Sequence, residues 1–257
     1  MTQEEQLNVL IRYLLAERKE YGNIPVPDSL AEKRRLLRSL MNVRPPVPAS
    51  EEFLRVQDAY LEERLAERGV TTLDGLTPVQ PDLYLWQGDI TTLAVDAIVN
   101  AANSQLLGCF VPCHGCIDNA IHTYAGVQLR LECARIMAEQ EKAEPTGKAK
   151  LTRAYNLPCR CVLHTVGPII SGAVTKTDRE LLASCYCSCL NVAAVNGLRS
   201  VAFCCISTGE FHFPNELAAE IAIQTVQRWQ QQNPNKIKVI FNVFKDSDHE
   251  IYKRLLQ

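Results

Sequence analysis

The sequence predicts a layered α/β/α fold that follows an all-helical N-terminal region. Over roughly the first 75 residues, apolar side chains recur at helical spacing. From Leu83 onward, short apolar runs alternate with amphipathic helical segments, a texture typical of a sheet covered by helices. The chain has 257 residues, 47% hydrophobic and 22% charged, which is enough to bury a sizeable core.

The N-terminal region carries clear helix boundaries. Ser29 is placed to cap the second helix, and prolines at 45, 46 and 48 end it. Gly69 is placed to stop the third helix. We therefore expect residues 1–75 to form a helical extension of a larger domain over residues 76–257. The expected helices span Gln3–Arg18, Leu30–Met41 and Ser50–Arg68.

The second region alternates strands with helices that are long enough to cover a sheet face. No internal repeat or low-complexity stretch interrupts it. The expected strands are Leu83–Gln87, Ala97–Asn100, Val162–Val166, Ser200–Cys205 and Lys238–Val243. The expected helices are Cys116–Ala125, Gln128–Gln140, Asp178–Asn196 and Asn215–Gln232.

The net charge and the hydropathy pattern limit the kinds of binding partner that this protein is expected to have. The net charge is −2 and no local basic patch stands out, so a nucleic-acid partner is not expected. The N-terminus, Met1 to Asn8, lacks a basic stretch leading into an apolar core, and no apolar run reaches the ~18 residues of a membrane span. We expect a cytoplasmic protein with no membrane partner.

The eleven cysteines are unevenly distributed. None precedes Cys109, and three of the eleven lie in a single loop, while the others fall inside expected helices and strands. Without a secretory signal, such thiols are expected to be reduced, buried or metal-bound rather than paired in disulfides. Only this loop brings several cysteines close enough together in the sequence to form a chemical site.

The cysteine-rich loop predicts a metal site. Cys109, Cys113, His114 and Cys116 bring three thiols and an imidazole within eight residues, and this donor set is typical of zinc. Four ligands would close a structural site, whereas three would leave a position for water or substrate. Free or redox-active thiols are the alternative.

Polar residues follow several of the expected strands, where α/β folds bind ligands. Asp89 follows the first strand, and Asn100 and Asn103 bracket the end of the second. The segment Ser207–Phe211 joins a strand to a helix, a geometry that points backbone N–H groups outward and suits a diphosphate. Each feature alone is more typical of a turn or cap, and Phe244 at a strand end is more typical of core packing.

Four motifs in order resemble those of the macrodomain family, over about Leu83 to Leu256. They are Gly88-Asp89-Ile90-Thr91, Val99-Asn100-Ala101-Ala102-Asn103, His164-Thr165-Val166-Gly167-Pro168 and Ile206-Ser207-Thr208-Gly209, the last with Phe211 and Pro214. The resemblance implies a three-layer α/β/α macrodomain with a mixed central sheet. The helical extension and the cysteine-histidine loop resemble the zinc-dependent macrodomains of bacteria, which remove ADP-ribose from proteins.

The resemblance also assigns roles to individual residues. It implies that Asp89 and Ile90 lie at the adenine, that Asn103 holds the distal ribose, and that Asn100 binds ribose or braces its loop. It assigns Asp118 to the scissile ribose, while His122 is interpreted as structural. Glu210 departs from the small residue common at its position, and its carboxylate would repel a diphosphate unless turned away or paired. The implied diphosphate loop is Ser207, Thr208, Gly209, Glu210 and Phe211, the implied adenine platform is Phe244, and the implied ligands are Cys109, His114 and Cys116, with Cys113 spare.

The resulting hypothesis is a hydrolase with one Zn²⁺ per chain that removes mono-ADP-ribose O-linked to acidic side chains of a target protein. Asp118 and Asn103 would be its catalytic residues. The modified protein is expected to be a target of a bacterial ADP-ribosylating sirtuin. The alternatives are a reader that binds ADP-ribose without cleaving it and carries a structural zinc, and a nucleotide-metabolite hydrolase whose zinc never contacts substrate.

Overall fold

A computed structural model describes residues 1–234 and 237–257 of the chain. Its central feature is a seven-stranded mixed sheet in the order β2-β3-β9-β8-β5-β7-β6. The inner strands run parallel, whereas β2 pairs antiparallel with β3 and β6 antiparallel with β7 at the two edges. The predicted mixed sheet is therefore confirmed. The strands are β1 (Thr71–Thr72), β2 (Pro78–Gln80), β3 (Leu83–Gln87), β4 (Leu93–Ala94), β5 (Ala97–Ala101), β6 (Ala149–Arg153), β7 (Cys161–Thr165), β8 (Ser200–Phe203) and β9 (Lys238–Val243).

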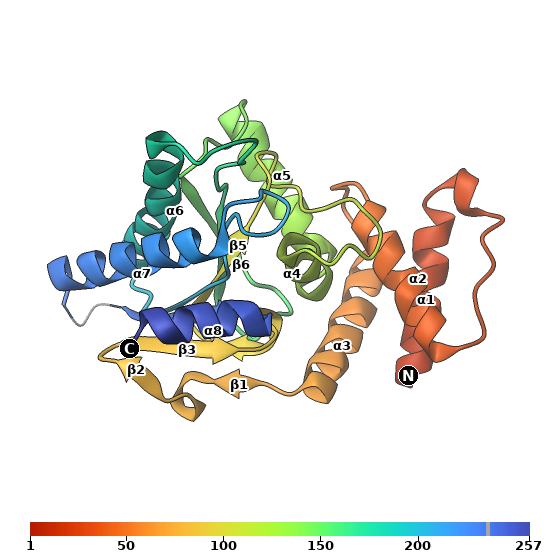
Figure 1. The fold of residues 1–257 in the computed structure, drawn as a ribbon. Coiled ribbons are helices and arrows are strands. Elements are labelled where there is room, and N and C mark those ends of the chain that lie inside the picture. The colour runs from red at the N-terminus through yellow and green to blue at the C-terminus, as the bar shows by residue number, and fades with distance from the viewer. Residues whose placement is uncertain (235–236) are drawn as a thin grey trace.

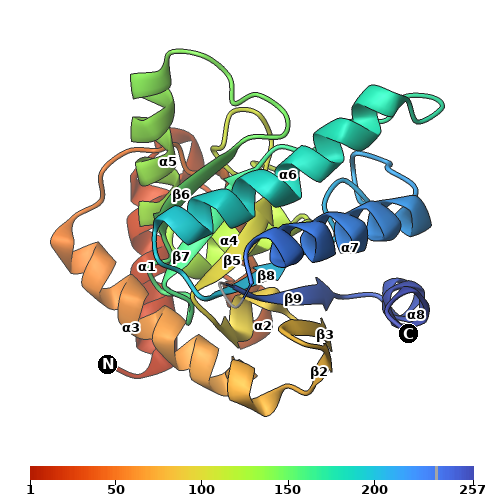
Figure 2. The same ribbon diagram turned by 90° about the vertical axis from the view of Figure 1, so that its left-hand side faces the viewer.

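The inner strands are buried apolar runs, as parallel strands covered on both faces require. Strand β8 is buried along its whole length, and every residue of β9 after its first is buried. Helices α6 (Lys176–Val195) and α7 (Asn215–Gln232) run side by side across one face of the sheet (Figure 2), and α8 (Asp246–Leu255) lies beside α7. Helices α4 (Ile117–Ala125) and α5 (Val127–Gln140) pack on β5 and β6. The layered α/β/α arrangement is confirmed.

Three helices form the N-terminal region, which lies to one side of the sheet (Figure 1). They are α1 (Gln3–Ala16), α2 (Leu30–Val43) and α3 (Glu51–Arg68), and their caps Thr2, Ser29 and Ser50 each accept a backbone N–H of the first turn. Their apolar faces form a hydrophobic cluster separate from the main core. The helical region ends at Arg68, before residue 75, because β1 follows and pairs with β4.

The expected strands and helices are found with shifts of one or two residues at most ends. Cys116, expected as the first helical residue, is instead the N-cap of α4. The sequence did not predict the edge strand β6, the short strands β1, β2 and β4, or helix α8. Across the described residues, no helix is long and apolar enough to cross a membrane.

Candidate active site and metal centre

The candidate site lies at the carboxyl ends of the parallel strands, the edge at which open α/β sheets bind ligands. Asp89 follows β3, Asn103 follows β5, Ser207 follows β8 and Phe244 follows β9. Because β3, β9, β8 and β5 are consecutive neighbours in the sheet, segments distant in sequence meet along one edge. The sheet order therefore gathers the predicted ADP-ribose residues.

Asp89 is held by two hydrogen-bonding partners. Its Oδ1 accepts the backbone N–H of Thr91 at 3.0 Å and the Thr91 hydroxyl at 2.6 Å. Its Oδ2 accepts Nη1 of Arg68, the last residue of α3, at 2.9 Å. The Arg68 guanidinium also lies 3.7 Å from the ring centroid of Tyr124. The N-terminal region thus reaches the expected adenine end of the site, where Ile90 is buried beneath the surface.

Asn100, Asn103 and Asp118 converge below the cysteine loop. Asp118 Oδ1 accepts Nδ2 of Asn100 at 2.8 Å, and its Oδ2 accepts Nδ2 of Asn103 at 3.3 Å. Asn103 also donates to the Gly108 carbonyl, while its Oδ1 accepts the N–H of Gln105. Asn100 is fully buried and Asn103 half-buried, so Asn100 lies in position to brace the loop and Asn103 faces the site.

Asp118 has an unusual environment. Burial raises the pKa of this carboxyl to about 6, although the Asn100 hydrogen bond and the Arg130 charge both favour the ionised form. His122 lies one turn further along α4, with its Nε2 3.5 Å from Asp118 Oδ1, and burial lowers the pKa of His122 well below its usual value. His122 is therefore neutral at pH 7, consistent with a structural role.

A second group of potential ligand atoms, His122, Cys133 and His164, is fully enclosed in the core. Asn100 donates Nδ2–H to Nδ1 of His164 at 3.1 Å, which leaves His164 Nε2 to donate to the Thr152 hydroxyl at 2.9 Å. Both nitrogens of His164 are thereby occupied. Within this group His164 is hydrogen-bonded in the core, whereas the two ring nitrogens of His122 are buried without a hydrogen-bond partner among the described residues.

The segment Ser207–Phe211 has the shape of an anion-binding loop. Ser207 has φ of 66°, in the left-handed region, and its buried Oγ has no partner among the described residues. A Cβ at Gly167 would lie 2.0 Å from that oxygen, so only glycine permits the two segments to approach. Gly209 is exposed, with open space beside its Cα, while Thr208 and Phe211 are half-buried.

Phe244, at the end of β9, is 76% exposed. A core role, which the sequence left open, requires burial and does not fit this position. An exposed aromatic ring at the carboxyl edge of the sheet is instead available for stacking on a ligand.

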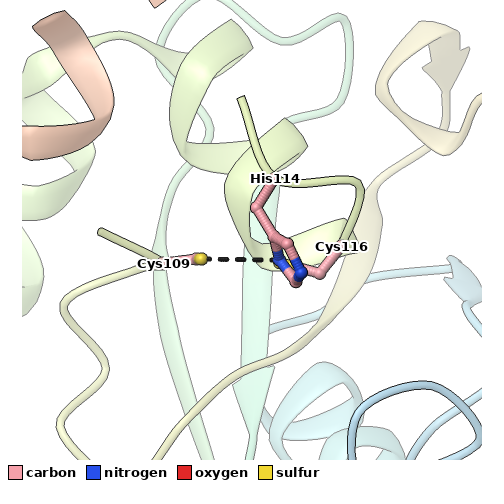
Figure 3. Close-up of side chains that lie close together, drawn as sticks. All are labelled: Cys109, His114 and Cys116. Atoms are coloured by element: carbon pink, nitrogen blue, oxygen red, sulfur yellow. Dashed lines mark hydrogen bonds between the residues drawn. The ribbon is translucent and has the colours of Figure 1, made fainter. Parts of the chain in front are cut away.

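The cysteine loop forms a three-ligand cluster. The ligand atoms of Cys109, His114 and Cys116 all lie within 4.8 Å of one another, and Figure 3 shows the Cys109 sulfur pointing toward the His114 imidazole. The Cys109 Sγ to His114 Nδ1 distance is 3.6 Å, which is about the S···N separation around a tetrahedral zinc ion with Zn–S of ~2.3 Å and Zn–N of ~2.05 Å. The donor set and spacing therefore fit zinc.

The thiol of Cys116 is partly buried. Burial raises the pKa of this thiol to about 12 in the absence of a cation, although its Sγ accepts the N–H of Asn119 at the start of α4. A nearby divalent cation would hold it as a thiolate. Cys113 points away from the cluster, with its Sγ 3.2 Å from the Ser39 hydroxyl of α2.

Glu210 contacts the cluster from the opposite loop. Its Oε1 lies 3.6 Å from His114 Nε2, the imidazole nitrogen that does not face Cys109. Metal-binding histidines usually donate their second N–H to a carboxylate or carbonyl. The Glu210 carboxylate, which would repel a bound diphosphate, thus faces the imidazole of His114.

Three arginines contact residues of the site, and no local sequence pattern predicted these contacts. Arg38 of α2 donates to the His114 carbonyl at 3.0 Å and to Asn119 Oδ1 at 2.7 Å. Arg130 of α5 is buried, and burial lowers its pKa to about 10; it donates to the carbonyls of Met41 and Asn42 at the end of α2. With Arg68, they attach the N-terminal helices to the site. On amphipathic helices such residues look solvent-exposed, so the contacts that each makes 20 or more residues away along the chain were the missing information.

Comparison with known proteins identifies the family of this chain. Residues 99–222 match the Macro domain family. A Treponema medium protein named protein-ADP-ribose hydrolase is 58% identical over the whole of both chains. A Staphylococcus aureus protein of the same name is 50% identical over 98% of this chain and 95% of its own.

Solved structures give the same result. The Trypanosoma brucei macrodomain in complex with ADP-ribose is 31% identical, covers 90% of this chain and 97% of its own, and has a TM-score of 0.67. The Oceanobacillus iheyensis macrodomain with ADP is 38% identical over 68% of this chain and 89% of its own, with a TM-score of 0.63. The chain belongs to the macrodomain family and is a hydrolase of the group that its Treponema and Staphylococcus relatives represent.

Proposed function

We propose that this chain is a zinc-dependent protein-ADP-ribose hydrolase that cleaves the O-glycosidic bond between the distal ribose and an acidic side chain. The observation that carries the proposal is the cluster of Cys109, His114 and Cys116 beside the hydrogen-bonded Asn103–Asp118 pair. A purely structural zinc would not require a carboxylate and an amide next to it.

Residues remote from the bond would supply binding energy. Asp89 offers carboxylate oxygens to the adenine amino group, and Phe244 offers an exposed ring for stacking. The Ser207–Phe211 loop would bind the diphosphate through backbone N–H groups. Binding at these points holds the distal ribose in place, which lowers the entropic cost of reaching the transition state.

The reacting end would be handled by Asn103 and Asp118. Asn103 would fix the ribose, and Asp118 would orient the attacking water and accept its proton. Asn100 and Asn103 both donate to the Asp118 carboxylate, so the carboxylate has a defined orientation before substrate binds. The chemistry that zinc supplies at a three-ligand centre is Lewis-acid polarisation of an oxygen atom.

The test is release of ADP-ribose from an aspartate- or glutamate-modified protein, with zinc measured before and after chelation. We expect about one zinc per chain, and loss of release on its removal while calorimetry still detects ADP-ribose binding. Cys116→Ala should lose both zinc and release. Cys113→Ala is the matched control and should retain zinc, because its thiol faces α2.

Each other result has a definite meaning. Zinc-free Cys116→Ala with normal release would contradict the zinc mechanism. Binding of ADP-ribose by the zinc-loaded protein without release from any modified protein would identify a reader instead.

A further inference from the structure

Behind the cysteine loop, the N-terminal helices and the macrodomain enclose a pocket of about 410 Å³. This volume lies within the usual range for ligand-binding pockets, about 300–1,000 Å³. Its walls come from α2, α3, α4 and Cys113 of the loop. The pocket is separate from the Cys109–His114–Cys116 cluster, because the Cys113 thiol turns toward α2. We refer to it as the arginine pocket, after Arg34, Arg35, Arg38 and Arg64, which line it.

The arginine pocket has an excess of positive charge. None of the described residues that line it is acidic. Glu67, outside the lining, is shared by Arg34 and Arg64. Arg38 donates only to neutral oxygens, those of Asn119 and His114. Arg35 is exposed and forms no ion pair within the described chain, so the four guanidinium groups face a single carboxylate.

The lining also has an apolar part. Leu37, Met41 and Leu61 are buried side chains of the helical cluster, and the rings of Tyr60 and Tyr124 lie beside them. Of these apolar side chains, only Tyr124 is half-buried rather than buried, so its ring is the apolar surface that a ligand could contact. A peptide that combines carboxylates with an apolar side chain fits this lining, because guanidinium groups form bidentate pairs with carboxylates while the apolar side chain packs on the ring.

The position of the pocket relates it to the reaction. Cys113 in its wall directly precedes His114, and Arg38 in its wall holds the His114 carbonyl. Under the proposed function, the protein chain attached to the scissile ribose would lie at the metal end, and Cys113 and Arg38 place the wall of the pocket next to that end. The net charge of the whole chain, −2, gives no general attraction for an acidic partner, so a local patch has to supply it.

We propose that the arginine pocket binds an acidic, partly apolar segment of the modified protein adjacent to the ADP-ribosylated residue. The inference rests on the proposed function, since it assigns the protein part of the substrate to a place on this chain. Binding there would favour target proteins whose modified residue has aspartate, glutamate and an apolar residue beside it.

The first experiment measures binding without catalysis. A fluorescein-labelled peptide of alternating glutamate and leucine is titrated with the zinc-loaded protein and followed by fluorescence anisotropy, beside a peptide with glutamine in place of glutamate. We expect only the acidic peptide to bind, more weakly as salt rises. Arg35→Glu should weaken it about tenfold. The matched control is Arg12→Glu, on the exposed face of α1, which should bind the acidic peptide as well as the wild-type protein does.

The second experiment links the pocket to turnover. Arg35→Glu should lower kcat/KM about tenfold for a modified peptide with acidic flanks and leave a peptide with neutral flanks unchanged. ADP-ribose binding by calorimetry should not change, because Arg35 lies outside the nucleotide site.

The outcomes separate the two proposals. The pocket assignment would be overturned if the acidic peptide bound equally well to the wild-type protein and to Arg35→Glu. It would also be overturned if pyrophosphate displaced the peptide at equal concentration. Absence of release from every modified substrate would overturn the hydrolase proposal and leave the anisotropy result as the test of the pocket.

Discussion

The carboxylate of Glu210 faces the cysteine loop. Glu210 belongs to the segment Ser207–Phe211, and its Oε1 lies 3.6 Å from Nε2 of His114, with 69% of its side chain exposed. Because a carboxylate beside the second nitrogen of a metal-binding imidazole can orient the ring and raise its basicity, Glu210 is positioned to act on the proposed zinc site.

We therefore expect Glu210→Gln to weaken zinc binding about tenfold, measured by competition with a chromophoric chelator. The variant should still bind ADP-ribose, since the diphosphate loses no N–H donor. The control is Glu139→Gln, because Glu139 is exposed on α5 and does not belong to the proposed site. Equal zinc retention in the two variants would show that the Glu210 contact has no influence on the metal.

His164 predicts a pH dependence of stability. Burial lowers the pKa of this imidazole to about 4 in the folded protein, from about 6.5 in the unfolded chain. Between these values the unfolded state binds more protons, so this residue's contribution makes the protein less stable as pH falls from 6.5 toward 4. Between pH 7 and pH 5 the loss is about 2 kcal/mol from this group.

His164→Asn removes that titration and keeps an oxygen to accept the Asn100 N–H. Urea unfolding gives the free energy of unfolding of the variant and of the wild-type protein at pH 7 and at pH 5. The variant's value minus the wild-type value should be about 2 kcal/mol more favourable at pH 5 than at pH 7. Comparison of the two proteins cancels the other titrating groups, including Asp118. If the difference between the two proteins were the same at pH 7 and pH 5, His164 would not be held neutral in the folded state.

Among single residues, the sequence pointed to those that belong to contiguous motifs. The proposed zinc ligands lie within eight residues, and Asp89, Asn103 and Ser207 each follow a recognisable strand. It missed Arg38, Arg68 and Arg130, because no local pattern records a contact between a helix of the extension and a loop of the macrodomain.

At the scale of elements, the carboxyl end of α2 is joined to the macrodomain by Arg130. Its guanidinium donates to the carbonyls of Met41, Asn42 and Arg44, oxygens that a helix end leaves without intrahelical partners. A cation at this end also interacts favourably with the helix dipole. Asn42 in turn accepts the backbone N–H of Cys113, so the same helix end supports the cysteine loop.

Arg130→Met should destabilise the protein by about 3 kcal/mol, because it leaves buried carbonyls without a donor. Urea unfolding measures this change, and hydrogen exchange should show faster exchange at the Cys113 amide. Arg135→Met lies on the exposed face of the same helix and should shift stability by less than about 0.5 kcal/mol. Similar values for the two variants would remove Arg130 as the connection.

Elements with a strong apolar pattern could be predicted, and weaker ones could not. Strands β3 and β9 were predicted to the residue because they are apolar runs. Strand β6, at the sheet edge, alternates with Lys150 and Thr152 and lacks such a run. Helix α8 is mostly polar and buries only Asp248 and Tyr252, so its signal is weak. Strands β1 and β4 have two residues each and exist only through their pairing.

At the scale of the whole molecule, two hydrophobic clusters are joined by polar contacts. Gln57 of α3 accepts the N–H of Val127 at 2.9 Å and donates to Gln128 at 2.7 Å, and Asp58 accepts Nδ2 of Asn156 at 2.8 Å. Together with Arg68 and Arg130, these contacts couple the extension to the sheet domain.

We expect the two clusters to unfold in one cooperative transition. Both tryptophans, Trp86 and Trp229, lie in the sheet domain, whereas far-UV circular dichroism reports all helices. The urea transitions followed by tryptophan fluorescence and by circular dichroism should therefore coincide. A helical loss that precedes the fluorescence change would show that the extension unfolds on its own.

The close approach of Gly167 to Ser207 has a thermodynamic consequence for ligand binding. The loop is tied by backbone hydrogen bonds from Phe213 to Ser207, from His212 to Gly209 and from Ile170 to Phe211, so its shape is set when the chain folds. The conformational entropy of ordering the loop is then lost in folding rather than in binding. Association at the diphosphate should accordingly carry little entropic penalty from the loop, and nucleotides that share the diphosphate should find the same preformed surface.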